Sequence, residues 1–165
     1  MKKTFFIVCL TTFIFAAYSA QGMINPWVDC EDDIRCGEQK AGFDFPIRVK
    51  NYTVRAMKGM IEVHFSMGDG RKVVARKALY FDADANEDGI IDISGDYNHY
   101  PIDKTIILSN GSKFSVRGED NNYKVVNFTS VGGHYSIVCN EGLSLSDVVY
   151  LYNFIAEEEN LKNKL

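Results

Sequence analysis

Short runs of β-branched and aromatic residues, separated by turns that contain glycine, fill the chain from residue 52 to residue 139. In residues 61–65 apolar and polar side chains alternate, which is typical of a strand with one buried face. Asn110 and Gly111 favour a hairpin turn, because both residues tolerate positive φ. By these signals the expected strands are residues 52–57, 60–66, 72–80, 105–108, 113–117, 124–129 and 134–139. We therefore predict an antiparallel meander sheet of about six to eight strands.

One short helix is expected before this sheet and another after it. Asp32 or Asp33 can cap a helix that runs to Lys40, and Gly42 then ends it in the left-handed conformation. Residues 144–147 form a capping box with aspartate in place of glutamate. The apolar residues of the second helix recur at intervals of three and four, and they are Leu145, Val148, Val149, Tyr152 and Ile155. A sheet with a helix at each end of the chain belongs to the α+β class.

Residues 1–22 have the features of a secretory signal peptide. Two lysines precede an apolar run, residues 5–17, that is too short to span a membrane comfortably. Small residues permit cleavage before Ala20 or before Met23, and both sites stay open. We therefore expect an exported protein, periplasmic or secreted. Its residues 23–165 are expected to form a single α+β domain with a polar C-terminal tail that frays.

The charge of the chain limits its partners. Removal of the two N-terminal lysines with the signal peptide leaves 16 basic against 22 acidic residues. Nucleic acids and anionic membrane surfaces select for basic patches, so neither is an expected partner. No later segment is long and apolar enough for a transmembrane span. A monomer is expected.

Three cysteines remain after removal of the signal peptide, and an odd number allows at most one intramolecular disulfide. An exported compartment permits such a bond. Cys30 can pair with Cys36, if the chain bends at the start of the first helix, or with Cys139. The alternative is three buried or idle thiols.

The strongest functional signal is an acidic stretch that follows the spacing of a calcium-binding loop. Its expected ligands, at loop positions 1, 3, 5, 7 and 9, are Asp84, Asn86, Asp88, the carbonyl of Ile90, and Asp92. Gly89 supplies the sharp turn at position 6, but position 12 is Gly95 and not the usual glutamate. Asp82 or Asp96 would then complete the shell. The alternative is a solvated acidic turn, which carboxylates and glycine also favour.

The remaining polar residues give little support for catalysis. The three histidines are isolated, so a zinc site has no paired ligands. His134 and Cys139 lie five residues apart on one expected strand, which places them on opposite faces. The polar and aromatic residues 96–100, together with Trp27, could line a ligand groove. More often such residues pack at the edge of a sheet with their polar tips in water.

Several short motifs occur in an order that resembles a known family. They are Asn25-Pro26-Trp27-Val28, Ala41-Gly42-Phe43, Asp92-Ile93-Ser94-Gly95-Asp96-Tyr97-Asn98, Val116-Arg117-Gly118-Glu119-Asp120, and Tyr135-Ser136-Ile137 with Gly142-Leu143-Ser144. In these motifs the chain resembles a family of small exported bacterial proteins that are catalogued as a domain of unknown function. Members of this family are often anchored in the envelope as lipoproteins. The resemblance implies the sheet-and-helix architecture and an extracytoplasmic location, and it brings no catalytic residues. Residues 81–91 are inserted relative to the family pattern, so the calcium hypothesis rests on this chain alone.

These signals favour an exported, non-enzymatic domain of the bacterial envelope that binds an unknown envelope protein or ligand and carries a calcium-stabilised acidic loop. The alternative is an envelope enzyme or enzyme inhibitor that uses Tyr97, Asn98 and His99 with nearby carboxylates. A cleft joining that loop to a second acidic residue and a histidine would favour the alternative. A filled sheet face without a deep pocket would favour the first hypothesis.

Overall fold

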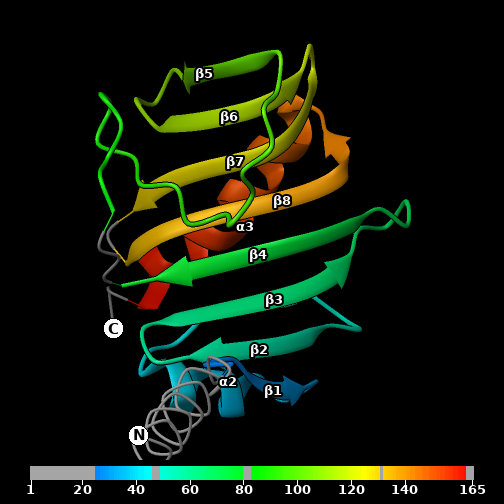
Figure 1. The fold of residues 1–165 in the computed structure, drawn as a ribbon, viewed down its shortest axis with the longest axis vertical. Helices are drawn as coiled ribbons and strands as arrows, with labels where there is room; N and C mark the ends of the chain where they lie inside the picture. Colours follow the sequence, from blue (N-terminus) through cyan, green and yellow to red (C-terminus); the bar gives the residue numbers. More distant parts are fainter. Residues whose placement is uncertain (1–24, 46–48, 80–82, 131, 163–165) are drawn as a thin grey trace, which may run out of the picture.

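The computed structural model describes residues 25–45, 49–79, 83–130 and 132–162, which form one antiparallel sheet and two helices (Figure 1). The strands are β1 (Val28–Glu31), β2 (Thr53–Met57), β3 (Met60–Ser66), β4 (Lys72–Ala78), β5 (Ile102–Ile107), β6 (Lys113–Glu119), β7 (Asn122–Ser130) and β8 (Gly133–Leu143). The helices are α2 (Ile34–Ala41) and α3 (Leu145–Lys162). The predicted meander sheet with a short N-terminal and a C-terminal helix is confirmed. The expected signal peptide, residues 1–22, lies outside the described residues.

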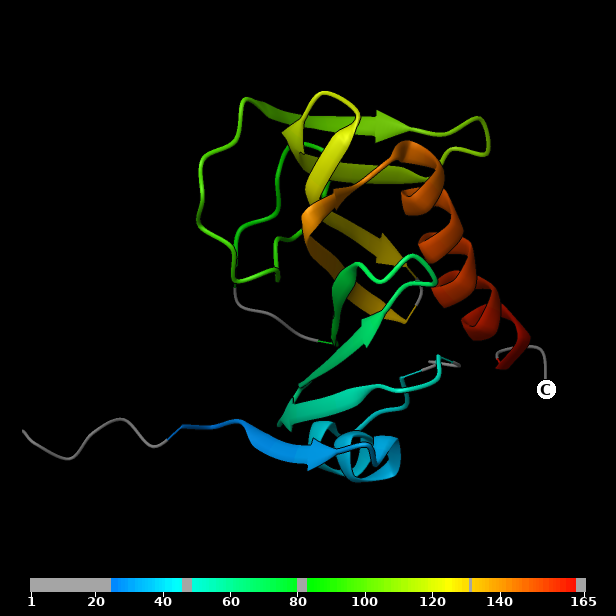
Figure 2. The same ribbon diagram turned by 90° about the vertical axis from the view of Figure 1, so that its right-hand side faces the viewer.

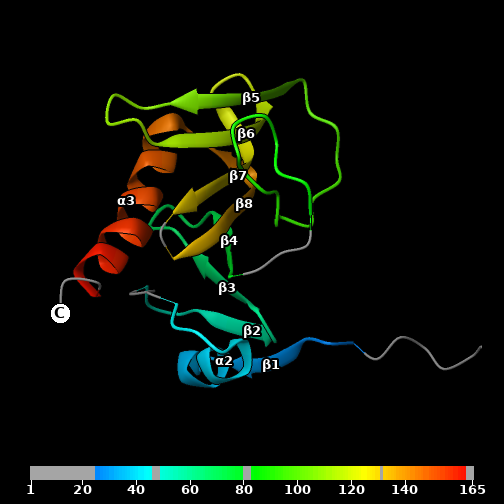
Figure 3. The same cartoon turned by 90° about the vertical axis from the view of Figure 1, so that its left-hand side faces the viewer.

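The sheet consists of two meanders that meet in the middle. Its strand order is β1-β2-β3-β4-β8-β7-β6-β5, so the last strand of each meander pairs with that of the other. The connection from β4 to β5 is long, and its residues 83–101 run over one face of the sheet in front of β7 and β8 (Figure 1). Figures 2 and 3 show α3 on the opposite side of these strands. The sheet thus has one face covered by helices and one covered partly by a loop.

The first helix forms where the sequence predicts it. The Asp33 side chain accepts hydrogen bonds from the backbone N–H groups of Arg35 and Cys36, which makes Asp33 and not Asp32 the N-cap. Gly42 ends the helix with a φ of 85°. Gly37 lets α2 approach the sheet closely, because a Cβ at this position would lie 2.5 Å from a methyl carbon of Val54.

The second helix packs on the sheet through a stripe that differs partly from the expected one. Val148, Leu151 and Ile155 are buried in the main core with the inner faces of both meanders. Leu145, whose place in the periodic apolar set predicts burial, is instead 38% exposed because it lies at the first turn of the helix. Val149 and Tyr152 are half-buried. α3 extends to Lys162, into the polar tail that was expected to fray, and among the described residues no helix is long and apolar enough to cross a membrane.

A disulfide joins Cys30 of β1 to Cys36 of α2, whereas Cys139 is a free, buried cysteine. Of the two pairings that the sequence allowed, the structure therefore has the local one. Replacing both Cys30 and Cys36 with serine is expected to lower the unfolding free energy by about 2 kcal/mol, the effect of closing a short loop in the unfolded chain. Urea denaturation with and without reductant measures this loss.

Reductant should leave the midpoint of the double serine variant unchanged, which separates the disulfide from other effects of reduction. Equal midpoints for the wild-type protein in both conditions would contradict the prediction.

Candidate functional site

A row of polar side chains crosses the whole sheet on the face opposite α3. Paired residues of antiparallel strands present their side chains on the same face. From β1 to β5 in spatial order, the row is Asp29, Arg55, Glu62, Arg76, Ser136, Asn127, Ser115 and Thr105. Its first half alternates acidic and basic residues, and its second half is neutral. The two halves of this polar row have different partners.

Glu62 is the centre of the charged half and is only 2% exposed. Arg76 donates to its carboxylate through Nε at 2.5 Å, His64 contacts it through Nε2 at 2.5 Å, and Arg55 lies 3.6 Å away. Burial acts to raise the pKa of Glu62, but the hydrogen bonds of His64 and Arg76 outweigh it and lower the pKa to about 2. Glu62 is therefore an ionised, buried carboxylate, and its contacts hold β2, β3 and β4 together.

The neutral half and the neighbouring residue Arg117 lie beneath the loop, and they contain polar atoms without partners. Within the described part of the chain, the buried side-chain atoms that make no hydrogen bond are Arg117 Nε, Asn127 Oδ1 and Ser136 Oγ. They come from three neighbouring strands, β6, β7 and β8. Buried polar groups are nearly always hydrogen-bonded in native proteins, and each exception calls for an explanation. This concentration marks the space between the loop and the sheet as the candidate site.

Arg117 fastens the loop to the sheet. Its Nη2 donates to Asp92 Oδ2 at 2.7 Å, to Ser94 Oγ at 3.0 Å and to the carbonyl oxygen of Asp96 at 2.8 Å. The side chain of Arg117 is only 15% exposed, so these charge-assisted bonds form in a poorly hydrated setting. A second basic residue of β6, Lys113, binds Asp88 at 2.8 Å.

An apolar contact completes the attachment of the loop. Ile93 is 3% exposed and packs with Met60 and Ala78 in a small core on this face of the sheet, separate from the main one. Trp27 and Met57 pack against the same core. The loop is therefore held to the outer face both by buried apolar area and by the guanidinium of Arg117.

The five predicted calcium ligands lie in different environments. Asp84 is exposed, and Asn86 Oδ1 accepts hydrogen bonds from the N–H groups of Asp88 and Ile90. The Ile90 carbonyl accepts from the N–H of Asn86. The hydrogen bond of Lys113 lowers the pKa of Asp88. Asp92 accepts from Ser94 N–H through Oδ1 and pairs with Arg117 through Oδ2.

Four of these five residues line one pocket of about 280 Å³ between the loop and the sheet. Its walls are Asp84, Ala85, Asn86, Ile90, Asp92, Asp103, Ser115, Arg117 and Asn127. Asp88, paired with Lys113, is not part of this lining. Across the described ranges, no three His, Cys, Asp or Glu side chains lie close enough together to hold a metal ion. The pocket therefore gathers oxygen atoms, but its carboxylates are not clustered closely enough to hold a metal ion by themselves.

Sequence reasoning missed the polar sheet residues of the pocket, which are Asp103, Ser115, Arg117 and Asn127. Asn127 could have been found from the sequence, because it is a polar residue within the apolar run Val125-Val126-Asn127-Phe128 of a buried strand. Asp103 could not have been found in this way, because an acidic residue on an exposed strand is ordinary. Only the pairing of β5 with β6 and of β6 with β7 brings both beside the loop.

A second pocket, of about 410 Å³, also borders the loop, and Trp27 and Tyr97 are among its walls. Met57, Met60 and Ile93 are among its apolar walls, and Arg76, Asp92 and Asp96 are among its polar ones. Tyr97 is 91% exposed. Of the residues predicted for an enzyme, Asn98 and His99 do not belong to the described walls of this pocket.

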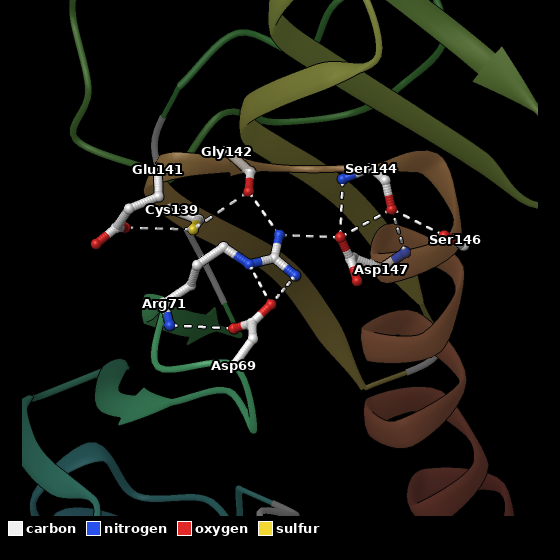
Figure 4. A network of polar contacts seen from close by, with 8 residues as sticks. All are labelled: Asp69, Arg71, Cys139, Glu141, Gly142, Ser144, Ser146 and Asp147. Carbon is white, nitrogen blue, oxygen red and sulfur yellow. Dashed lines mark hydrogen bonds and ion pairs between the residues drawn. The ribbon is translucent and has the colours of Figure 1, made fainter.

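A further polar network joins the β3–β4 turn to the start of α3 (Figure 4). Arg71 pairs with Asp69 and with Asp147, and it donates to the carbonyl of Gly142 at 2.7 Å. Asp147 accepts from the N–H of Ser144, and Ser144 Oγ accepts from the N–H of Asp147, so the predicted capping box is confirmed. The hydrogen bond from Arg71 lowers the pKa of Asp147 to about 2.

Cys139 lies in the same network, close to Glu141 and to the Gly142 carbonyl (Figure 4). Burial raises the pKa of its thiol, which keeps the sulfur protonated and unreactive. His134 instead contacts Thr129, at 3.2 Å, on the opposite face of β8. This network fixes the turn and the helix start and offers no activated nucleophile.

Comparisons with known proteins found no match, whether to a family model, to a curated protein or to a solved structure. The resemblance to a family of exported envelope proteins therefore stays a prediction.

Proposed function

We propose that the protein is an exported, non-enzymatic binding module of the bacterial envelope whose acidic loop, residues 84–92, binds calcium. The observation that carries this proposal is the pocket in which Asp84, Asn86, Ile90 and Asp92 meet. Calcium takes 6–8 oxygen ligands from carboxylates, amides, backbone carbonyls and waters, and these side chains and the Ile90 carbonyl belong to those classes.

Two further features support export and binding. The N-terminal residues 1–22 have the signal-peptide pattern, and the Cys30–Cys36 disulfide is compatible with an oxidising compartment. The pocket between Trp27 and Tyr97 offers an aromatic and polar surface for an envelope protein or ligand. The loop shapes this surface, since Asp92 lines both pockets.

Calcium is expected to raise the melting temperature of the mature protein. A ligand that binds only the folded state stabilises it by about 2.7 kcal/mol at a concentration one hundred times the dissociation constant. Extracellular calcium modules bind at about 10⁻⁴–10⁻³ M, so millimolar calcium is about one to ten times the dissociation constant and should stabilise the fold by about 0.4–1.4 kcal/mol. Magnesium should have a smaller effect, because it demands a tight octahedron and gives up its waters reluctantly. Melting temperatures measured in calcium, in magnesium and in chelator test this prediction.

Two single substitutions, each removing one negative charge, form a test variant and its matched control. Asp84→Asn is expected to reduce the calcium effect strongly, whereas Asp120→Asn, in the exposed turn between β6 and β7, should leave it intact. Superimposable wild-type curves in calcium and in chelator would leave only an acidic turn and would refute the proposal.

A further inference from the structure

We infer that the calcium ion is shared between the loop and the sheet, with Asp103 of β5 and Asn127 of β7 as ligands and Asp88 outside the site. This inference rests on the proposed function. It differs from the sequence hypothesis, in which one continuous loop supplies the ligands.

Acceptors without partners gather at this one pocket. Within the described residues, the carboxylates of Asp84 and Asp103 make no hydrogen bond or ion pair. Asn127 lines the same pocket, and its Oδ1 is buried without a partner although the residue is only 1% exposed. A buried acceptor without a donor costs about 1–3 kcal/mol, so this oxygen favours a bound positive charge or donor.

The charge of the pocket suits a divalent cation. Three carboxylates, those of Asp84, Asp92 and Asp103, face one guanidinium, so the lining has a net charge of −2. Arg117 directs Nη2 to Asp92, Ser94 and the Asp96 carbonyl, so its charge offsets that of Asp92, and the carboxylates of Asp84 and Asp103 are left without a counter-charge. A water bound to the ion has a second lone pair for the unpartnered Arg117 Nε.

Asp88 has another role. Lys113 binds its carboxylate at 2.8 Å from the neighbouring strand, and the residue does not line the pocket. The ion pair lies at the surface and holds the tip of the loop to β6. In contrast to the expectation from spacing alone, Asp88 therefore neutralises a lysine and leaves the ion to the sheet residues.

Sharing the ion gives calcium a defined effect on the loop. The acidic side chains are not clustered closely enough to hold an ion among the described residues, so we expect calcium to draw the loop toward β5 and β7. Calcium then fastens the loop over the polar row and fixes the wall of the neighbouring Trp27–Tyr97 pocket.

Calorimetric titration of the mature protein with calcium tests the inference through four substitutions. Asp103→Asn and Asn127→Leu are expected to weaken calcium binding at least tenfold. Asp88→Asn and the surface control Asp120→Asn should change it less than threefold. Asn127→Leu should also melt no lower than wild type in chelator, because leucine replaces an unpartnered amide at similar volume. Asp103 is exposed, so its variant carries the test if Asn127→Leu fails to fold.

The possible failures can be told apart. A wild-type protein that does not bind calcium refutes the proposed function and this inference with it. If the wild type binds and Asp88→Asn abolishes binding while Asp103→Asn leaves it unchanged, the loop alone holds the ion. That result overturns the inference and leaves the proposed function standing.

Discussion

Replacing Val148 with aspartate is expected to cost several kcal/mol of unfolding free energy, enough to unfold much of the protein. Val148 is fully buried on the face of α3 that packs against the sheet. A carboxylate there would lose its hydration without gaining a partner, which is among the most destabilising changes a core can suffer. Urea denaturation followed by circular dichroism measures the loss.

Asn153→Asp provides the control, because it places the same carboxylate on the exposed side of the same helix. This variant should stay within about 0.5 kcal/mol of wild type, as most surface substitutions do. A Val148→Asp variant with the wild-type midpoint would show that α3 is not packed through this face.

Replacing Glu62 with glutamine is expected to destabilise the protein by roughly 3–5 kcal/mol at neutral pH. This is the usual effect of removing the charge of one partner from a buried ion pair. The glutamine keeps the shape of the side chain but leaves Arg76 without its counter-charge. Urea denaturation at pH 7 measures the loss. Glu119→Gln, at an exposed position at the end of β6, should have little effect.

The same carboxylate predicts how stability depends on pH. The pKa of Glu62 falls from 4.5 to about 2 on folding, so between these values the unfolded chain binds more protons than the folded one. Its contribution is complete above pH 4.5 and is lost as the pH falls toward 2. Asp147, with a pKa lowered from 3.8 to about 2, adds a loss in the lower part of this window.

Unfolding free energies measured from pH 6 to pH 2 should therefore fall steeply for wild type and less steeply for Glu62→Gln. Parallel profiles for the two proteins would show that Glu62 does not titrate as its contacts require.

Local chemistry was sufficient to predict most strands, turns and helix ends. Residues 108–112 close a hairpin, in which Leu108 N–H donates to the Ser112 carbonyl and the Leu108 carbonyl accepts from Gly111 N–H. Gly111 has the positive φ that its turn requires. Asp33 and Gly42 cap α2, and Ser144 and Asp147 cap α3, because caps depend on groups within a few residues. β1 was missed, since Val28–Glu31 forms a strand only by pairing with β2.

The sequence by itself thus determined the local elements and the acidic loop with its spacing, because alternation, capping and turn conformation act over a few residues. Only the tertiary structure decided that β8 lies beside β4, that a polar row crosses all strands, and that Asp103 and Asn127 meet the loop. It also decided that Cys36 and not Cys139 pairs with Cys30. The physical reason is that strand order and cross-strand contacts depend on segments far apart in the chain, whose pairing is chosen by the burial of the whole sheet.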